Sequence, residues 1–175
     1  MDDLAIVAAQ LDREPRSAVH AVARCHLGLP TVIAVPPYLD DGSPFPTRYW
    51  LTCPLAVRRI GRLESAGGVK AADARILADP LFAARHDAAM RRYAADRDAL
   101  ISGAVSGPRP TGGVGGALAG VKCLHAHYAD HLAGNDNPVG EEVATEVDPL
   151  DCAVPCTVEA EGTLVRNPRW EEPRR

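Results

Sequence analysis

A thiol and three imidazoles lie within nine positions of this 175-residue chain, between residues 123 and 131. They belong to Cys123, His125, His127 and His131. If this stretch is helical at 100° per residue, Cys123, His127 and His131 form one row, whereas His125 points away from Cys123. Side chains at i, i+4 spacing are close enough to bind one metal ion, so this stretch is the first candidate for chemistry.

A closed structural zinc site needs four ligands, and one helix supplies two or three at most. Cys25 and Cys53 stand at the ends of the first and third of three expected strands. In an antiparallel meander the first and third strands run in the same direction, which puts both cysteines at one end of the sheet. The sequence therefore predicts a zinc site with the ligands Cys25, Cys53, Cys123 and His127, an iron–sulfur cluster being the less favoured occupant.

Other interpretations of these residues stay open. His125 and His131 are alternative ligands or supporting groups. Single cysteines are often small buried hydrophobes, and the lack of any C-x2-C pair favours that view. Alternatively, Cys53 at a helix N-terminus, or Cys123, is a nucleophile that acts with a histidine. Cys152 and Cys156 are expected to share no role, although an oxidative clip between them is the alternative.

The glycine-rich stretch from residue 102 to residue 120 leads toward the histidine-bearing helix. A flexible glycine loop before a helix offers backbone N–H groups to an anion, and flanking basic side chains add positive charge. The stretch lacks the Gly-Lys-Ser/Thr ending of a nucleotide-binding loop. The sequence predicts a site for a small anion or phosphate at Arg109, Gly113, Gly115, Gly116 and Lys122.

Apolar periodicity and turn residues indicate the elements that must position these groups. Strands are expected over 17–25, 31–35 and 47–52. Helices are expected over 2–12, from 54 to the Gly67-Gly68 stop, and over 70–78, 80–101, 121–133 and 138–147. The expected fold is α+β, a small antiparallel three-stranded meander packed against five to six helices. Residues 1–147 form a single domain in this prediction, and residues 148–175 form an irregular, partly disordered tail.

Composition limits the classes of partner. The formal net charge is −4 at pH 7, which does not favour binding to nucleic acid or to an anionic membrane. No run approaches the roughly 20 apolar residues of a membrane span, and the acidic start does not resemble a secretory signal. We therefore expect a cytoplasmic protein whose five cysteines stay reduced.

The chain resembles the actinobacterial family catalogued as domain of unknown function 501, over residues 4 to about 147. The resemblance rests on segments that agree in order: Arg24-Cys25, Asp41-Gly42-Ser43-Pro44-Phe45-Pro46-Thr47, Tyr49-Trp50-Leu51-Thr52-Cys53-Pro54, Ile60-Gly61-Arg62-Leu63-Glu64, Gly112-Gly113-Val114-Gly115-Gly116, Gly120-Val121-Lys122-Cys123-Leu124-His125-Ala126-His127 and Asn137-Pro138-Val139-Gly140. The resemblance implies a bacterial cytosolic protein and supplies no mechanism.

Together these observations predict a cytosolic, zinc-stabilised binding or regulatory module that acts on a protein partner or a small anion. The alternative is a cysteine-dependent or metal-dependent hydrolase, whose phosphorylated or anionic substrate is held by the glycine-rich loop.

Overall fold

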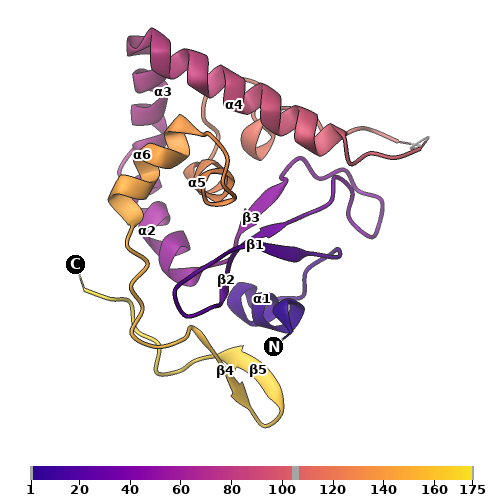
Figure 1. Cartoon of the computed structure of the whole chain (residues 1–175), viewed down its shortest axis with the longest axis vertical. Coiled ribbons are helices and arrows are strands. Elements are labelled where there is room, and N and C mark those ends of the chain that lie inside the picture. Colours follow the sequence, from indigo (N-terminus) through magenta and orange to yellow (C-terminus); the bar gives the residue numbers. More distant parts are fainter. Residues whose placement is uncertain (1, 104–106, 175) are drawn as a thin grey trace.

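The computed structural model describes residues 2–103 and 107–174, and within them it confirms the α+β fold (Figure 1). Strands β1 (His20–Arg24), β2 (Pro30–Ala34) and β3 (Tyr49–Leu51) form an antiparallel sheet in the order β1-β2-β3. The helices are α1 (Asp3–Leu11), α2 (Pro54–Ser65), α3 (Gly68–Ala78), α4 (Pro80–Asp98), α5 (Leu124–Leu132) and α6 (Pro138–Val147), and a 3-10 turn, η1, covers Val114–Gly116. The predicted three-stranded meander and its helices are thus present.

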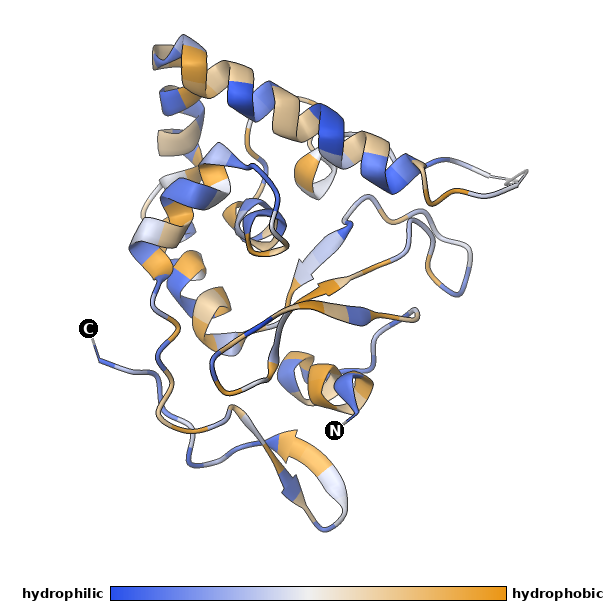
Figure 2. Ribbon diagram, in the orientation of Figure 1, coloured by the Kyte–Doolittle hydropathy of each residue, from blue (hydrophilic) through white to orange (hydrophobic). Residues whose placement is uncertain are grey.

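Strand β2 is the centre of the sheet and is buried along its whole length. Alternating side chains of a strand point to opposite faces, so Val32 packs into the main core with α2, α5 and α6, whereas Ile33 packs against Val7 of α1. Figure 1 shows α1 on one side of the sheet and the other helices on the opposite side. In Figure 2 the helices alternate between apolar and polar residues, as expected of helices with one buried face.

Proline and polar caps fix where the helices begin. Pro54, Pro80 and Pro138 each stand at the first helical position, where a missing N–H costs nothing. Asp79 accepts hydrogen bonds from the backbone N–H groups of the first turn of α4, and Asn137 accepts one from Gly140 N at the start of α6. These residues place the starts of α2, α4 and α6 where the sequence predicts them, whereas α3 begins at Gly68 rather than residue 70 and α5 at Leu124 rather than residue 121.

A buried carboxylate joins α4, α5 and the start of α6. Asp130 of α5 is fully buried, and its Oδ2 lies 2.6 Å from Nη2 of Arg92 on α4. The side-chain amides of Asn135 and Asn137 also donate to Asp130, at 3.0 and 2.8 Å. Because a buried carboxylate is costly unless it is paired and hydrogen-bonded, these contacts hold three segments in one arrangement.

The chain after α6 differs from the expected irregular tail. Residues Thr157–Ala160 (β4) and Thr163–Arg166 (β5) form an antiparallel hairpin. The tail is also anchored to α2, because Nη1 of buried Arg59 donates to the carbonyl oxygens of Val147 and Pro149 at 2.7 and 2.6 Å. These contacts are long-range, which is why no local pattern indicated them.

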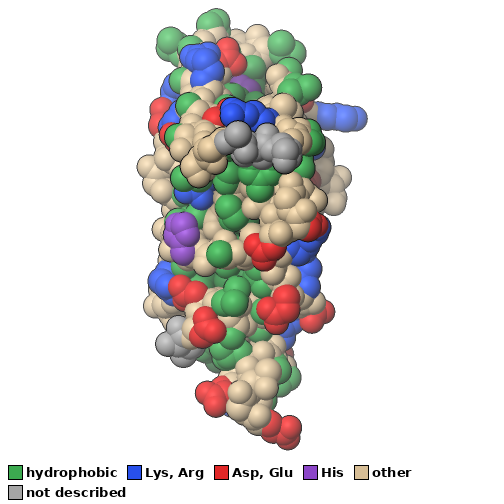
Figure 3. All heavy atoms as spheres, turned by 90° about the vertical axis from the view of Figure 1, so that its right-hand side faces the viewer, with side chains coloured by type: hydrophobic (Ala, Val, Ile, Leu, Met, Phe, Trp, Pro, Cys, Tyr) green, Lys and Arg blue, Asp and Glu red, His purple; other side chains and the backbone are tan. Residues whose placement is uncertain are grey.

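Acidic, basic and apolar side chains are interspersed on the face shown in Figure 3. Within the part of the chain that the structure describes, no helix combines the length and apolar character that a membrane crossing requires.

Gly140 sets the distance between α5 and α6, and replacing it tests this packing. A Cβ at position 140 would lie 2.3 Å from the His127 carbonyl oxygen and 2.6 Å from the His131 Cβ. We expect Gly140→Ala to lower the free energy of unfolding by about 1–3 kcal/mol in urea denaturation, because the helices must move apart.

Gly61→Ala is the matched control, since a Cβ at this helical position meets nothing within 4 Å. It should raise the free energy of unfolding by about 0.5–1 kcal/mol through the better helix propensity of alanine. Equal effects of the two substitutions would contradict the proposed packing role of Gly140.

Candidate functional site

Glu64, Cys123 and His125 bring one oxygen, one sulfur and one nitrogen together. The ligand atoms of these three side chains all lie within 4.8 Å of one another. His125 Nδ1 is 3.7 Å from Cys123 Sγ and 3.2 Å from Glu64 Oε1. Each of the three side chains is half-buried, so the cluster lies at the edge of the protein interior.

The local backbone explains why Cys123 meets His125. Cys123 is the residue before α5 and has an extended conformation, with φ −158° and ψ 121°. Its side chain therefore does not follow the helical row with His127 and His131 that the sequence predicts. The prediction that His125 points away from Cys123 is wrong for the same reason, since it assumed that Cys123 was already helical.

Glu64 belongs to the last turn of α2 and fastens this helix to the start of α5. Its Oε1 accepts a hydrogen bond of 2.6 Å from the backbone N–H of Leu124. A carboxylate is stabilised at a helix N-terminus by the exposed N–H groups and the helix dipole. The same oxygen faces His125, so one carboxylate both positions α5 and completes the cluster.

The hydrogen bond of the second ring nitrogen, Nε2, determines which nitrogen of the neutral His125 ring carries the hydrogen. Nε2 lies 3.1 Å from the Val57 carbonyl oxygen, which can only accept, so Nε2 carries a hydrogen. In the neutral ring the lone pair is then on Nδ1, which faces both Cys123 and Glu64. A histidine that donates its other N–H to a carbonyl is the usual arrangement of a metal ligand.

In the absence of a metal, Nδ1 of His125 binds a proton between Cys123 and Glu64. Burial lowers the pKa of His125, but contacts with Cys123 and the Val57 carbonyl and the charge of Glu64 raise it to about 9. Proton and metal therefore compete for one position between the three groups. A Cys–His–Glu catalytic relay is a poorer fit, because it requires the thiol and the carboxylate on opposite ring nitrogens, and here both face Nδ1.

A cavity of about 480 Å³ opens beside this cluster. This volume falls in the usual range of small-molecule sites. Its wall is mainly apolar and includes Cys123 and His125 together with Tyr49, Trp50, Leu51, Val57, Gly115 and Ala126. Two of the three clustered side chains thus reach a space that a ligand can enter.

The structure does not bring together the four predicted zinc ligands. Cys123 lies in the cluster just described, whereas Cys25 and Cys53 line a different, smaller cavity. His127 is fully buried, with its Nδ1 3.0 Å from Asn137 Oδ1 and its ring stacked on His86. The alternative ligand His131 is half-buried and packs beside Gly140 on α6.

Cys53 is the N-terminal cap residue of α2, as predicted, but its surroundings do not activate its thiol. The residue is buried, and this burial raises the pKa of the Cys53 thiol to about 11, against the opposing influence of the Ala56 and Leu55 N–H groups. The thiolate is the nucleophile, so this environment does not favour catalysis by Cys53.

The glycine-rich segment uses its backbone N–H groups internally. Gly113 N donates to the Ala117 carbonyl at 2.8 Å, Gly116 N to the Gly113 carbonyl at 2.9 Å, and Val114 N to Met90 Sδ at 3.3 Å. A Cβ at Gly113 would lie 2.7 Å from Met90, so this glycine permits close packing against α4.

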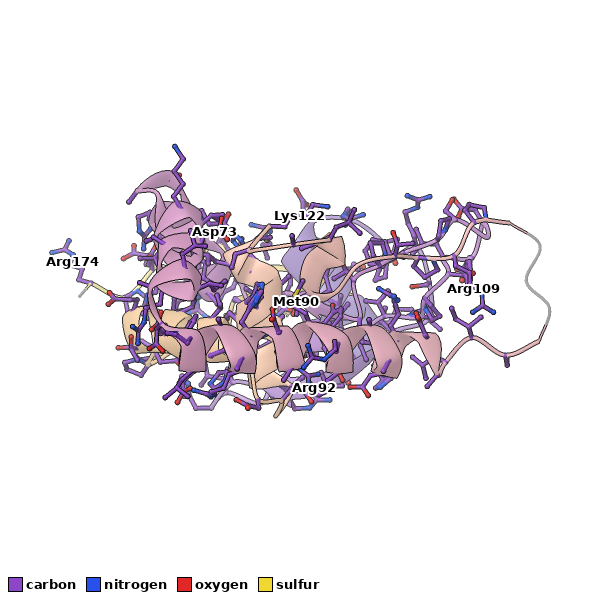
Figure 4. All side chains as sticks on the ribbon, turned by 90° about the horizontal axis from the view of Figure 1, so that it is seen from above. Asp73, Met90, Arg92, Arg109, Lys122 and Arg174 are labelled. Carbon is purple, nitrogen blue, oxygen red and sulfur yellow. The ribbon has the colours of Figure 1, made fainter. Side chains whose placement is uncertain are left out.

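The two basic residues of the predicted anion site are exposed and separated. Figure 4 places Lys122 near the middle of the molecule and Arg109 toward the loop that follows α4. Of the five predicted residues, Gly115 lines the large cavity. Anion binding at this segment stays a prediction.

Sequence reasoning did not identify two groups of residues. Glu64 lies at the end of one motif of the family resemblance, yet no spacing connects α2 with α5 along the chain. Cys152 and Cys156 were expected to share no role, but both line the small cavity with Cys25 and Cys53. In each case the missing information was which helix or tail segment packs against which.

A family model described as "Protein of unknown function (DUF501)" matches residues 21–145. Searches of curated proteins and of solved structures gave no match.

The five thiols should differ in reactivity according to these environments. We expect iodoacetamide at neutral pH to alkylate Cys123 at least about tenfold faster than Cys53, because Cys123 lines the open cavity, whereas Cys53 is buried with a raised pKa. Peptide mass spectrometry of the metal-free protein over time measures both rates. Denaturant should remove the difference, and a faster reaction at Cys53 in the folded protein would contradict this assignment.

Proposed function

Because the chain belongs to the DUF501 family, whose members have no established function, we propose its role from its own geometry: a metal-binding module centred on Glu64, Cys123 and His125. The observation that carries this proposal is the convergence of three ligand atoms of different elements within 4.8 Å.

The chemistry of the three side chains favours zinc. Thiolate and imidazole are preferred ligands of Zn²⁺, and a carboxylate commonly completes its coordination. Magnesium and calcium prefer sets made entirely of oxygen ligands, so the thiolate disfavours both. In the expected reducing cytosol, Cys123 stays available for zinc rather than for a disulfide.

Three protein ligands leave one tetrahedral position for a water molecule or a bound compound. Because Cys123 and His125 both line the cavity of about 480 Å³, this position is on the cavity side in the proposal. The apolar wall would accept the body of a small molecule, while an anionic or other electron-rich group of that molecule binds the metal. In this proposal the module therefore binds a small ligand through zinc.

Replacing single ligands tests this site. We expect Cys123→Ser and His125→Gln each to weaken zinc binding by at least about tenfold, because each removes one of three protein ligands. The measurement is isothermal titration calorimetry of the metal-free, reduced protein with zinc, together with elemental analysis after dialysis.

His131→Gln is the matched control, since it makes the same substitution on the same helix outside the cluster. It should leave the zinc affinity unchanged. The proposal fails if all three variants bind zinc as the unmodified chain does, or if the loss follows His131 rather than His125.

A further inference from the structure

Four of the five cysteines line one small cavity at the opposite end of α2 from Glu64. They are Cys25, Cys53, Cys152 and Cys156, and all four are free thiols. The cavity has a volume of about 10 Å³, close to the space that a single water molecule or ion requires. Its wall is otherwise mainly apolar, with Leu27, Leu29, Pro30, Pro54 and Leu150 around the sulfurs.

These cysteines come from three separate parts of the chain. Cys25 follows β1 in a tight turn, in which Gly28 N donates to the Cys25 carbonyl at 2.9 Å. Cys53 links β3 to α2, and Cys152 and Cys156 belong to the tail. Only tertiary packing brings residues 25, 53, 152 and 156 to one point, so their proximity does not follow from a local turn.

Two side chains direct N–H groups at these sulfurs. Trp170 Nε1 donates to Cys152 Sγ at 3.3 Å, and Gln10 Nε2 donates to Cys156 Sγ at 3.5 Å. Gln10 is 4% exposed, and its Nε2 also donates to the Pro30 carbonyl oxygen at 2.9 Å, so the Cys156 sulfur receives the second of its two hydrogens. A neutral thiol is a weak acceptor, whereas N–H donors stabilise a thiolate, which is the form that binds metal.

We propose that Cys25, Cys53, Cys152 and Cys156 form a second metal site, a closed four-thiolate site for Zn²⁺ that fastens the tail to the domain. Four cysteines with no open position are the usual set of a structural zinc site. On binding, the four thiols release their protons to solvent and the four sulfurs coordinate the ion. This site is independent of Glu64, Cys123 and His125.

The sulfurs draw together when the ion binds. Among the described residues, the cluster at Glu64 is the one group of three or more ligand atoms that all lie within 4.8 Å of one another, so no three of these four sulfurs are that close together. The turn after β1 and the irregular chain around Cys152 and Cys156 are the segments that can move inward. Binding then contributes to folding, because the closed arrangement exists only with the metal.

The consequence for the protein is a tail whose attachment depends on metal. Without zinc, the contacts of the tail include the Arg59 hydrogen bonds, the Arg62–Glu172 ion pair and the contact of Arg58 with the Trp170 ring. Leu150 and Trp170 also pack against the main core, and Nη2 of Arg166 on β5 donates to the Gln10 carbonyl oxygen of α1 at 3.0 Å. Exposed ion pairs contribute little to stability, so a four-thiolate site would be the strongest single connection between tail and domain.

The experiment uses the full chain, purified anaerobically, with zinc as the only added metal. We expect the double variant Cys152→Ser/Cys156→Ser to lose one zinc equivalent per chain by elemental analysis, whereas Cys123→Ser keeps that equivalent. Chelation of zinc should speed tryptic cleavage after Arg166 and Arg169 by at least about tenfold in the unmodified chain, because the tail is then less firmly attached. The cleavage rate of the double variant should not change on chelation.

A third variant probes the sulfur contacts without removing a ligand. Trp170→Phe keeps a ring beside Arg58 and removes the N–H that points at Cys152, so zinc at this site should bind about tenfold more weakly. Circular dichroism checks that each variant is folded; if the double variant is not, Cys25→Ser and Trp170→Phe supply the zinc measurement.

Three results would overturn this inference. The first is an unchanged zinc content in folded variants that lack these cysteines. The second is an intact mass that shows a disulfide between two of the four in anaerobically purified protein. The third is iron with sulfide in place of zinc. If His125→Gln loses zinc and the variants of the four cysteines do not, the four-cysteine site is excluded and only the site at Glu64 is supported.

Discussion

The buried carboxylate of Asp130 is the constraint on which the rest of this structure depends. It is fully buried, and its oxygens are bound by Arg92 of α4 and by the side-chain amides of Asn135 and Asn137. Removing one partner of such a group leaves an uncompensated charge, at a cost of about 3–5 kcal/mol. The position of α5 relative to α4 and α6 is therefore specified by hydrogen-bond geometry as well as by apolar packing.

This network also fixes the state of a neighbouring histidine. Because the Asn137 amide nitrogen donates to Asp130, its Oδ1 must accept, and it accepts from Gly140 N and from His127 Nδ1. Burial lowers the pKa of His127 to about 4, so the ring is neutral near pH 7. His127 therefore belongs to the core network that holds α5, and His125 two residues earlier is left to face Cys123 and Glu64.

With α5 held in this way, its N-terminus meets the end of α2, and this contact builds the candidate metal cluster. Helix α2 connects the two proposed sites, with Cys53 before its first residue and Glu64 in its last turn. One site opens onto a cavity large enough for a small molecule, whereas the other surrounds a space near the size of one ion. The first arrangement suits ligand exchange, and the second suits a structural ion.

The sequence by itself determined the fold class, the three strands and the helix starts at Pro54, Pro80 and Pro138. It also identified the stretch from Cys123 to His131 as rich in metal-binding side chains. These features depend on local chemistry, namely side-chain periodicity, caps and the fixed φ angle of proline. Tertiary structure decided how the ligands are grouped. Cys123 lies beside Glu64 and His125 rather than beside Cys25 and Cys53, because its extended backbone turns the side chain out of the helical row. Cys152 and Cys156 line the same small cavity as Cys25 and Cys53, because long-range contacts of Arg59 and Trp170 hold the tail against the domain. No residue spacing along the chain predicts such contacts.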